Sequence, residues 1–536
     1  MRYQIIISIA ALFAGVAASA QNFNPVVEVT NTYAQEATGI EKPDQPIAVP
    51  DSLLRFNLDM DYEMRTAPYR GAYEFNPYLV ELKPMPRQAE EGTLFLRLGA
   101  GYGFHPELDA VWTPVKTEKF RLNLFANHRG YYGDYHNIGL TDDNCLRGDG
   151  TLYGGADATT AAGVNTLLGW QTGTFTAGLQ YQNVLSSDPW TEVFNHLVVF
   201  DTRVQSAPQT KLYYNLGAQV RYLTRTGLNG TFVSGDGGLG VNLSQSQFRV
   251  DFNAESAFTS MGNAGQAAFT PRYVFRMGAF RLNLGLKLAF TFRSDENFFP
   301  YEGGHVFPDV HVDYQVVPED FILQAYATGG NVMQNYGRLL SRNHFMPSFM
   351  NHPLDVETER INVGAGARGN ISERLHYDAR IGYAYRTNGL LWGYETAYNL
   401  LPTVGFADYG MFYADLEAGW KSERLDADMH LRYQSANVQA EHMFSPAAFT
   451  AQAKLLYNWG GRIKAGADLD AVTERSTSEG IRVPGYADLG LYGEYGFTRK
   501  FALWLRVGNL LNQEVQRTLF HAERGIWFSV GAQYHF

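Results

Sequence analysis

The sequence predicts an all-β protein: a transmembrane antiparallel β-barrel of about 22 strands with a short N-terminal segment. Three observations predict this fold class. An export signal is followed by no apolar stretch long enough for a membrane helix. The chain alternates apolar and polar residues with period two from about residue 93. Short and long connections alternate between these segments.

The first twenty residues have the three parts of a secretory signal peptide. Met1-Arg2 gives a positive start, Ile5 to Val16 is apolar, and Ala18-Ser19-Ala20 forms a small-residue cleavage site. We therefore expect residues 1–20 to be removed and the mature chain to begin at Gln21. No later stretch approaches the roughly 18 consecutive apolar residues of a membrane helix.

Residues 424–434 illustrate the alternation. Apolar and aromatic side chains occupy the odd positions from Leu425 to Tyr433, and charged or polar ones occupy the even positions. A strand places each set on one face, whereas a helix would mix them. The same pattern recurs at 120–127, 249–258, 280–293 and 375–386. It predicts a polar inner wall that includes Arg121, Arg281, Asp378, Arg380, Asp426, Asp428, His430, Arg432 and Arg506.

The segments are longer than ordinary globular strands and suit a tilted crossing of a bilayer. Short turns alternate with longer connections, among them 131–152, 329–356 and 388–406, as in outer-membrane barrels. The segment 93–536 accommodates about 22 strands; the short Leu108–Thr113 is the weakest and could lower the number by two. We expect Tyr131 and Tyr135 to belong to an aromatic girdle.

Composition narrows the functional classes. The net charge of -11 argues against nucleic-acid binding, which needs a basic face. Cys145 is the single cysteine, so neither an internal disulfide nor a cysteine-based metal site is expected. No G-x-S-x-G nucleophile motif occurs, and we expect no enzymatic activity and no cofactor.

The C-terminus carries a family resemblance. The chain ends in an alternating segment that includes Tyr534 and closes on Phe536, an expected signal to the barrel assembly machinery. Together with Asn509-Leu510-Leu511-Asn512 and Arg524-Gly525, this segment resembles the end of TonB-dependent receptors. The resemblance covers residues 93–536. It implies a barrel in the outer membrane of a Gram-negative bacterium, in contact with lipid, that takes up a ligand.

The N-terminal segment, residues 21–92, departs from that family. It is much shorter than the globular plug domain that usually precedes the barrel. It is either a reduced plug or a periplasmic extension that binds a partner. Pro25, Val26, Val27, Glu28, Val29 and Thr30 resemble a TonB box, which would pair by strand addition with an energy-coupling protein. An ordinary β-prone stretch is the alternative.

Three functions remain open at this stage. The first is an uptake receptor, which the box-like segment favours. The second is an accessory or scaffold barrel closed by a periplasmic or surface partner, which the missing plug favours. The third is a passive porin. In the connection 329–356, His344, Met346, Met350 and His352 could bind haem or copper, but packing of its apolar residues into the barrel mouth is favoured.

Overall fold

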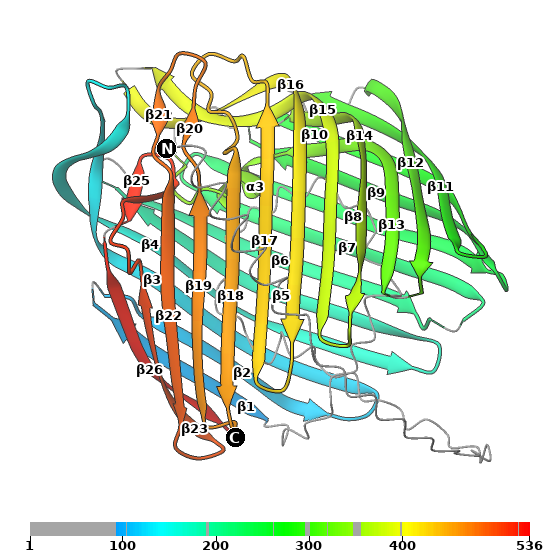
Figure 1. Ribbon diagram of the computed structural model, residues 1–536, viewed down its shortest axis with the longest axis horizontal. Helices are drawn as coiled ribbons and strands as arrows, with labels where there is room; N and C mark the ends of the chain where they lie inside the picture. The colour runs from blue at the N-terminus through cyan, green and yellow to red at the C-terminus, as the bar shows by residue number, and fades with distance from the viewer. Residues whose placement is uncertain are drawn as a thin grey trace, which may run out of the picture. The chain divides into compact units, whose positions relative to one another are not determined.

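The computed structural model describes residues 93–102, 104–188, 192–208, 210–260, 262–294, 301–318, 320–346, 355–396, 399–523 and 525–536. They form a closed barrel of 22 antiparallel strands (Figure 1). β1 (Leu94–Gly101) pairs with β2 (Glu107–Lys116) on one side and with β26 (Trp527–His535) on the other, which closes the ring. The predicted fold class and strand number are confirmed.

The other barrel strands follow one another around the ring in chain order. They are β3 (Phe120–Leu140), β4 (Leu146–Trp170), β5 (Gly173–Ser187), β6 (Glu192–Ser206), β7 (Leu212–Arg225), β8 (Leu228–Asn242), β9 (Ser246–Thr259), β10 (Gly262–Met277), β11 (Phe280–Ser294), β12 (Tyr301–Val317), β13 (Phe321–Gln334), β14 (Asp355–Ile371), β15 (Leu375–Thr396), β16 (Asn399–Lys421), β17 (Leu425–Ala436), β18 (Phe449–Trp459), β19 (Ile463–Val472), β22 (Tyr486–Gly496) and β23 (Phe501–Gly508).

Four short strands and one helix lie in the connections. β20 (Arg475–Ser476) and β21 (Arg482–Val483) form a small hairpin, while β24 (Val515–Thr518) pairs with β25 (His521–Glu523), which pairs with β3. Among the residues that the structure describes, α3 (Tyr336–Leu340) is the single helix. No helix in these ranges has the length and apolar character needed to cross a membrane.

The alternation separates two faces along each strand. On β11, Leu284 and Leu286 are 45% and 48% exposed, whereas Asn283 and Lys287 are 5% and 7% exposed. An antiparallel barrel with an apolar outer face and a polar inner face satisfies all its backbone groups and suits lipid outside. The chain is therefore a transmembrane barrel of the outer-membrane type.

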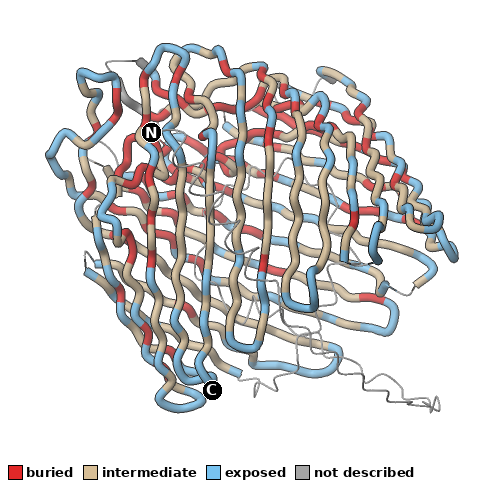
Figure 2. Tube along the Cα trace, viewed as in Figure 1, coloured by how far each residue is buried: buried red, intermediate tan, exposed pale blue. Residues whose placement is uncertain are grey.

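The two ends of the barrel differ. At one end, which we call the turn end, short turns such as 117–119 and 278–279 join the strands, and Leu94 lies hydrogen-bonded to Phe536. At the other end, which we call the loop end, the longer connections gather. Figure 2 shows that buried residues concentrate toward the loop end.

Two connections are much shorter than predicted. Most of 131–152 belongs to β3 and β4, and most of 388–406 belongs to β15 and β16. Cross-strand pairs continue from His136 opposite Leu152 up to Leu140 opposite Leu146. Backbone hydrogen bonding therefore extends these hairpins. In 131–152 a polar, Gly-rich sequence conceals the strand pattern.

The girdle assignment of Tyr131 and Tyr135 is also wrong. Both side chains are buried, and their rings lie 5.1 Å apart on the inward face of β3. The Phe345 ring lies 5.7 Å from that of Tyr135. These tyrosines therefore pack against the connection between β13 and β14 inside the barrel rather than facing lipid.

Candidate functional site

The connection that follows β13 folds into the barrel. We call residues 335–346 the inward loop. Its single helical turn, α3, begins after Asn335, whose side chain accepts a hydrogen bond from the Arg338 backbone N–H at 3.0 Å. This is a standard N-terminal cap, which satisfies a backbone donor that the helix leaves unpaired. Tyr336, Leu339 and Leu340 are buried on one side of the turn.

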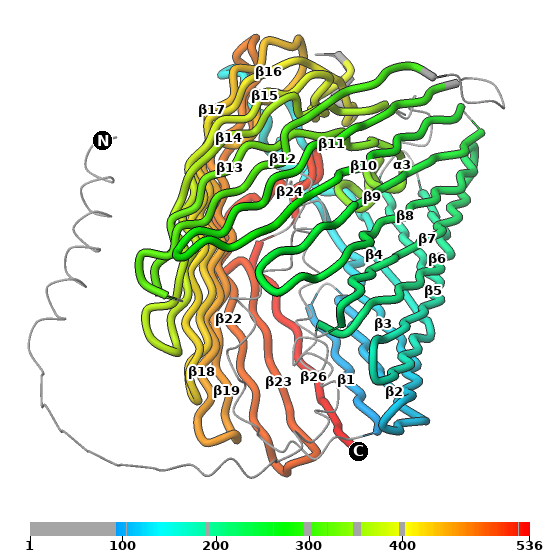
Figure 3. The backbone as a smooth tube through the Cα atoms, turned by 90° about the vertical axis from the view of Figure 1, so that its right-hand side faces the viewer, coloured from blue at the N-terminus to red at the C-terminus, as the bar shows by residue number. Residues whose placement is uncertain are grey.

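The buried side of the inward loop packs against many strands. Figures 1 and 3 both place α3 within the outline of the barrel, toward the loop end. Its apolar cluster joins residues of six neighbouring strands, β5 to β10, to residues of β13 and β15. The members outside α3 are Val184, Leu197, Leu223, Leu228, Phe232, Ala257, Ala264, Met333, Met346 and Leu390. The inward wall at this level carries an apolar patch beside polar side chains, which corrects the expectation of a polar inner wall.

Polar contacts fasten the beginning of the inward loop to the wall. The Tyr336 hydroxyl accepts a hydrogen bond from Arg225 on β7 and donates one to Asn195 on β6 at 3.0 Å. The Arg338 guanidinium forms an ion pair with Glu255 on β9 at 3.1 Å. Because a buried hydroxyl and guanidinium need partners, these contacts fix the direction in which α3 crosses the barrel.

The end of the inward loop reaches β3 and β4, which lie nearly opposite β13 in the ring. His344 Nδ1 contacts the Asp157 carboxylate of β4 at 2.7 Å. The His521 ring stacks on Phe345 at 3.9 Å. Burial disfavours the charged imidazole, but the charge and hydrogen bond of Asp157 outweigh it and raise the pKa of His344.

This placement bears on the metal hypothesis for the same connection. His344 is bound to Asp157, and Met346 is buried in the apolar cluster. Met350 and His352 lie outside the described residues. Within the described ranges no group of three or more potential metal ligands occurs. These contacts of His344 and Met346 are the ones expected if the connection packs into the barrel mouth.

The predicted wall residues lie opposite the exposed apolar face and pair in small groups. Arg380 contacts Asp378 and Glu417, each at 3.2 Å. Arg432 and His430 both approach Asp415, at 3.5 and 3.8 Å. Arg506 lies 3.9 Å from Asp468. The remaining predicted wall residues have these cross-strand neighbours: Arg281 lies directly opposite Asp313, Asp426 opposite Lys421, Asp428 opposite Lys454 and Arg121 opposite Leu167.

A second charged group on the wall was not singled out by the sequence. Arg272 on β10 contacts Asp251 on β9 at 3.3 Å and Asp309 on β12 at 2.5 Å. Arg249 contacts the same Asp251 carboxylate at 2.8 Å. Arg249 and Asp251 belong to the polar face of the alternating segment 249–258. Only the register of β9 to β12 brings Asp309 beside them.

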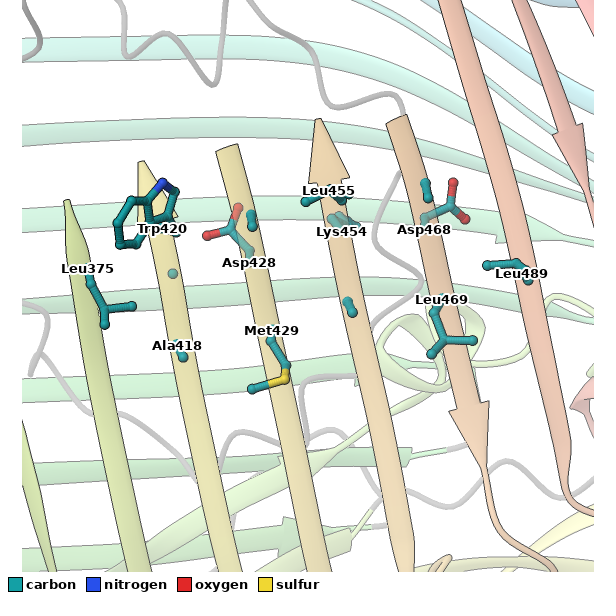
Figure 4. A pocket seen from close by; sticks show the side chains of 14 residues that line it. Leu375, Ala418, Trp420, Asp428, Met429, Lys454, Leu455, Asp468, Leu469 and Leu489 are labelled. Atoms are coloured by element: carbon teal, nitrogen blue, oxygen red, sulfur yellow. The ribbon is translucent and has the colours of Figure 1, made fainter. Parts of the chain in front are cut away.

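The outer face carries a shallow apolar depression across β15 to β19 and β22. Its lining is mostly leucines and small residues, with Leu375, Trp420 and Met429, and also includes Asp428, Lys454 and Asp468 (Figure 4). Asp428 and Lys454 occupy alternate positions on the same strands, and therefore belong to the opposite face. The apolar part of this lining matches the hydrocarbon of the lipid rather than a polar solute.

Two predicted sites remain predictions. The box-like segment Pro25–Thr30 lies outside the described residues, as do the rest of 1–92. Tyr534 and Phe536 lie at the turn end of β26, with exposed fractions of 38% and 61%. Their exposure leaves both rings accessible to an assembly factor.

No protein-family model and no curated protein matches the chain. Solved structures do match its fold. The FrpB iron transporter from Neisseria meningitidis aligns with a TM-score of 0.62 and 10% identity over 83% of this chain and 82% of its own. The copper transporter OprC aligns with a TM-score of 0.57 and 13% identity over 83% and 80%. The siderophore receptor PirA from Acinetobacter baumannii gives 0.58 and 8% over 83% and 80%.

At these identities the likeness establishes the fold. The chain has the barrel fold of these transporters and receptors, the fold that the resemblance of its C-terminal segment implies. The ligands named for the similar structures differ from one another, so the barrel alone does not select a ligand.

Proposed function

We propose that this protein takes up a ligand across the outer membrane through a barrel whose loop end is gated by the inward loop. The observation that carries the proposal is the course of residues 335–346 from β13 to β4, held at Arg225, Glu255 and Asp157. A segment fastened across the mouth opposes free diffusion, and its release opens a path along the charged wall.

The inward loop favours gated uptake over a passive porin. Its apolar side chains are buried as completely as those of a globular core, with Leu339 at 0% and Met346 at 1% exposure. Burying a leucine contributes about 1.5–3 kcal/mol, so displacement of the loop requires a compensating interaction. A ligand that binds the loop or its partners would supply that interaction.

Energy coupling is the finer part of the proposal. Pro25, Val26 and Val27, with the residues up to Thr30, would pair as an added strand with a TonB-type protein. The backbone hydrogen bonds of strand addition supply much of the affinity of such a complex. Residues 21–92 would then form a second barrier, which coupling removes. A periplasmic or surface partner that closes the barrel is the competing arrangement.

Single-channel conductance in planar bilayers tests gating. Four proteins are compared: the mature chain, a form without 21–92, a form with 335–346 replaced by a Gly-Ser linker, and a form with both changes. We expect the mature chain to be silent and the doubly changed form to conduct strongly. The single changes show how much each segment restricts the current.

A matched control inserts the same linker into the turn 278–279 at the turn end. It tests whether any loosened connection raises conductance. If the mature chain conducts as much as the doubly changed form, neither segment gates the barrel, and a passive pore replaces our proposal. If all forms stay silent, the barrel is closed by other parts of the chain, which contradicts gating by the inward loop.

A further inference from the structure

The inward loop carries two arginines. Arg338 lies within α3, whose buried residues include Tyr336, Leu339 and Leu340, and Arg342 follows two residues after the end of the helix. The Arg338 side chain is 32% exposed, so a solute can reach it. The structure gives the Arg342 guanidinium neither an ion pair nor a hydrogen bond within the described part of the chain.

The facing wall adds donors to these arginines. Glu255 on β9, the partner of Arg338, lies directly opposite Gln266 on β10. The Gln266 side chain is 3% exposed, and its amide nitrogen has no hydrogen-bond partner. Arg221 on β7 lies within electrostatic range of both Arg338 and Glu255, and its Nε is buried without a partner. Buried donors without partners are rare, and each one calls for an acceptor.

Positive charge exceeds negative charge at this place. Four guanidinium groups, those of Arg221, Arg338, Arg342 and Arg386, meet three carboxylates. Arg221 and Arg338 share Glu255, whereas Glu357 and Glu359 lie beside Arg386. Glu357 acts on Arg342, but its carboxylate is engaged by Arg386 at 3.4 Å and by the Gln334 amide at 2.8 Å. Burial and the neighbouring charges of Arg338 and Arg386 lower the pKa of Arg342. Guanidinium groups held close together in this way are stabilised by a bound anion.

We propose that Arg338 and Arg342 of the inward loop, with Arg221 and Gln266 of the wall, bind a small multiply charged anion. Carboxylate and phosphate groups share the required chemistry, because planar guanidinium donors match both. The anion would contact the loop and the wall at once. That this anion is the transported ligand rests on the proposed uptake function; the binding site itself does not.

Calorimetric titration of the detergent-solubilised mature chain with pyrophosphate, and separately with citrate, tests the site at low ionic strength, where screening is weak. We expect saturable binding of at least one of the two anions. Arg342→Gln should weaken it about tenfold, the loss expected for a charge-assisted hydrogen bond. Arg342→Lys should retain part of the affinity. Glu255→Gln should tighten binding, because it removes the competing negative charge.

Arg506→Gln is the matched control, since Arg506 lies on the wall at β23, away from α3, and also has an acidic neighbour. It should leave affinity unchanged. Each variant is checked for a folded barrel by its heat-dependent shift in gel mobility.

Absence of binding by the mature chain, or equal affinity in Arg342→Gln and the mature chain, overturns the proposal. Conductance separates the two ideas. Linker replacement of 335–346 could leave the current unchanged while pyrophosphate binds the mature chain and Arg342→Gln weakens that binding. Gating by the inward loop would then be wrong, and the anion site would stand. If the linker opens the barrel and Arg342 is irrelevant to binding, the anion site alone fails.

Discussion

The turn end and the loop end are formed by the same alternating strands, but the side chains that face the barrel interior differ between them. At the turn end inward side chains are charged and form ion pairs along the wall, for example Arg203 on β6 with Asp236 on β8 at 2.8 Å, across Gly217 of β7. At the loop end an apolar patch of inward side chains, with a few polar contacts beside it, supports the inward loop. The comparison teaches that a barrel wall is polar where it faces water and becomes a core where the chain folds back onto it.

The largest expected effect follows from Leu339, which is 0% exposed on the buried side of the inward loop. Leu339→Ala should cost about 2–5 kcal/mol of local packing, because a cavity remains where the side chain was. The loop should then leave the wall more often. Trypsin cleavage after Arg338 and Arg342, followed by mass spectrometry, should become at least about tenfold faster, as open states become more populated.

Leu505→Ala on the outer face of β23 is the comparison variant, since Leu505 is 45% exposed to the lipid side. It should leave cleavage after Arg338 and Arg342 unchanged. Equal cleavage of the two variants would mean that the loop end is no better packed than the outer surface.

A smaller effect should appear with pH. The pKa of His344 is raised from 6.5 by its pairing with Asp157, despite burial. The pairing therefore stabilises the inward loop fully below about pH 6.5 and loses this contribution as pH rises through the raised value. Cleavage after Arg342 should accelerate toward alkaline pH.

Asp157→Asn tests the origin of this pH dependence. The amide keeps the size of the side chain and removes its charge, so the variant should show little change in cleavage over the same pH range once the intrinsic pH profile of trypsin is subtracted. A profile identical to that of the unchanged chain would assign the dependence to another group.

The smallest effect is expected at the turn end. Arg203 and Asp236 have side chains 39% and 53% exposed. Exposed ion pairs contribute about 0–1 kcal/mol because water screens them. A double-mutant cycle with Arg203→Met and Asp236→Asn, followed by urea unfolding, should give a coupling energy within that range. A coupling energy of about 3 kcal/mol or more would make the turn end as tightly organised as the loop end.

Alternation in the sequence places the charged residues of a strand on one face, but it misplaced Tyr131 and Tyr135. Asp378, Arg380 and Arg432 lie on the polar face, and each has a partner on a neighbouring residue or strand. Alternation is a local property, since consecutive side chains of a strand point to opposite sides. It does not reveal which strand residue lies across from which, so the contact of Arg272 with Asp309 required the register.

By itself, the sequence determined the class of the protein: an antiparallel membrane barrel of about 22 strands. Only the tertiary structure decided where residues 335–346 go. Tyr336 meets Arg225, 111 residues earlier, and His344 meets Asp157, 187 residues earlier. No local period encodes such contacts. Closure of the ring decides which strands lie opposite β13. The contacts depend on that placement and on the apolar surface of those strands.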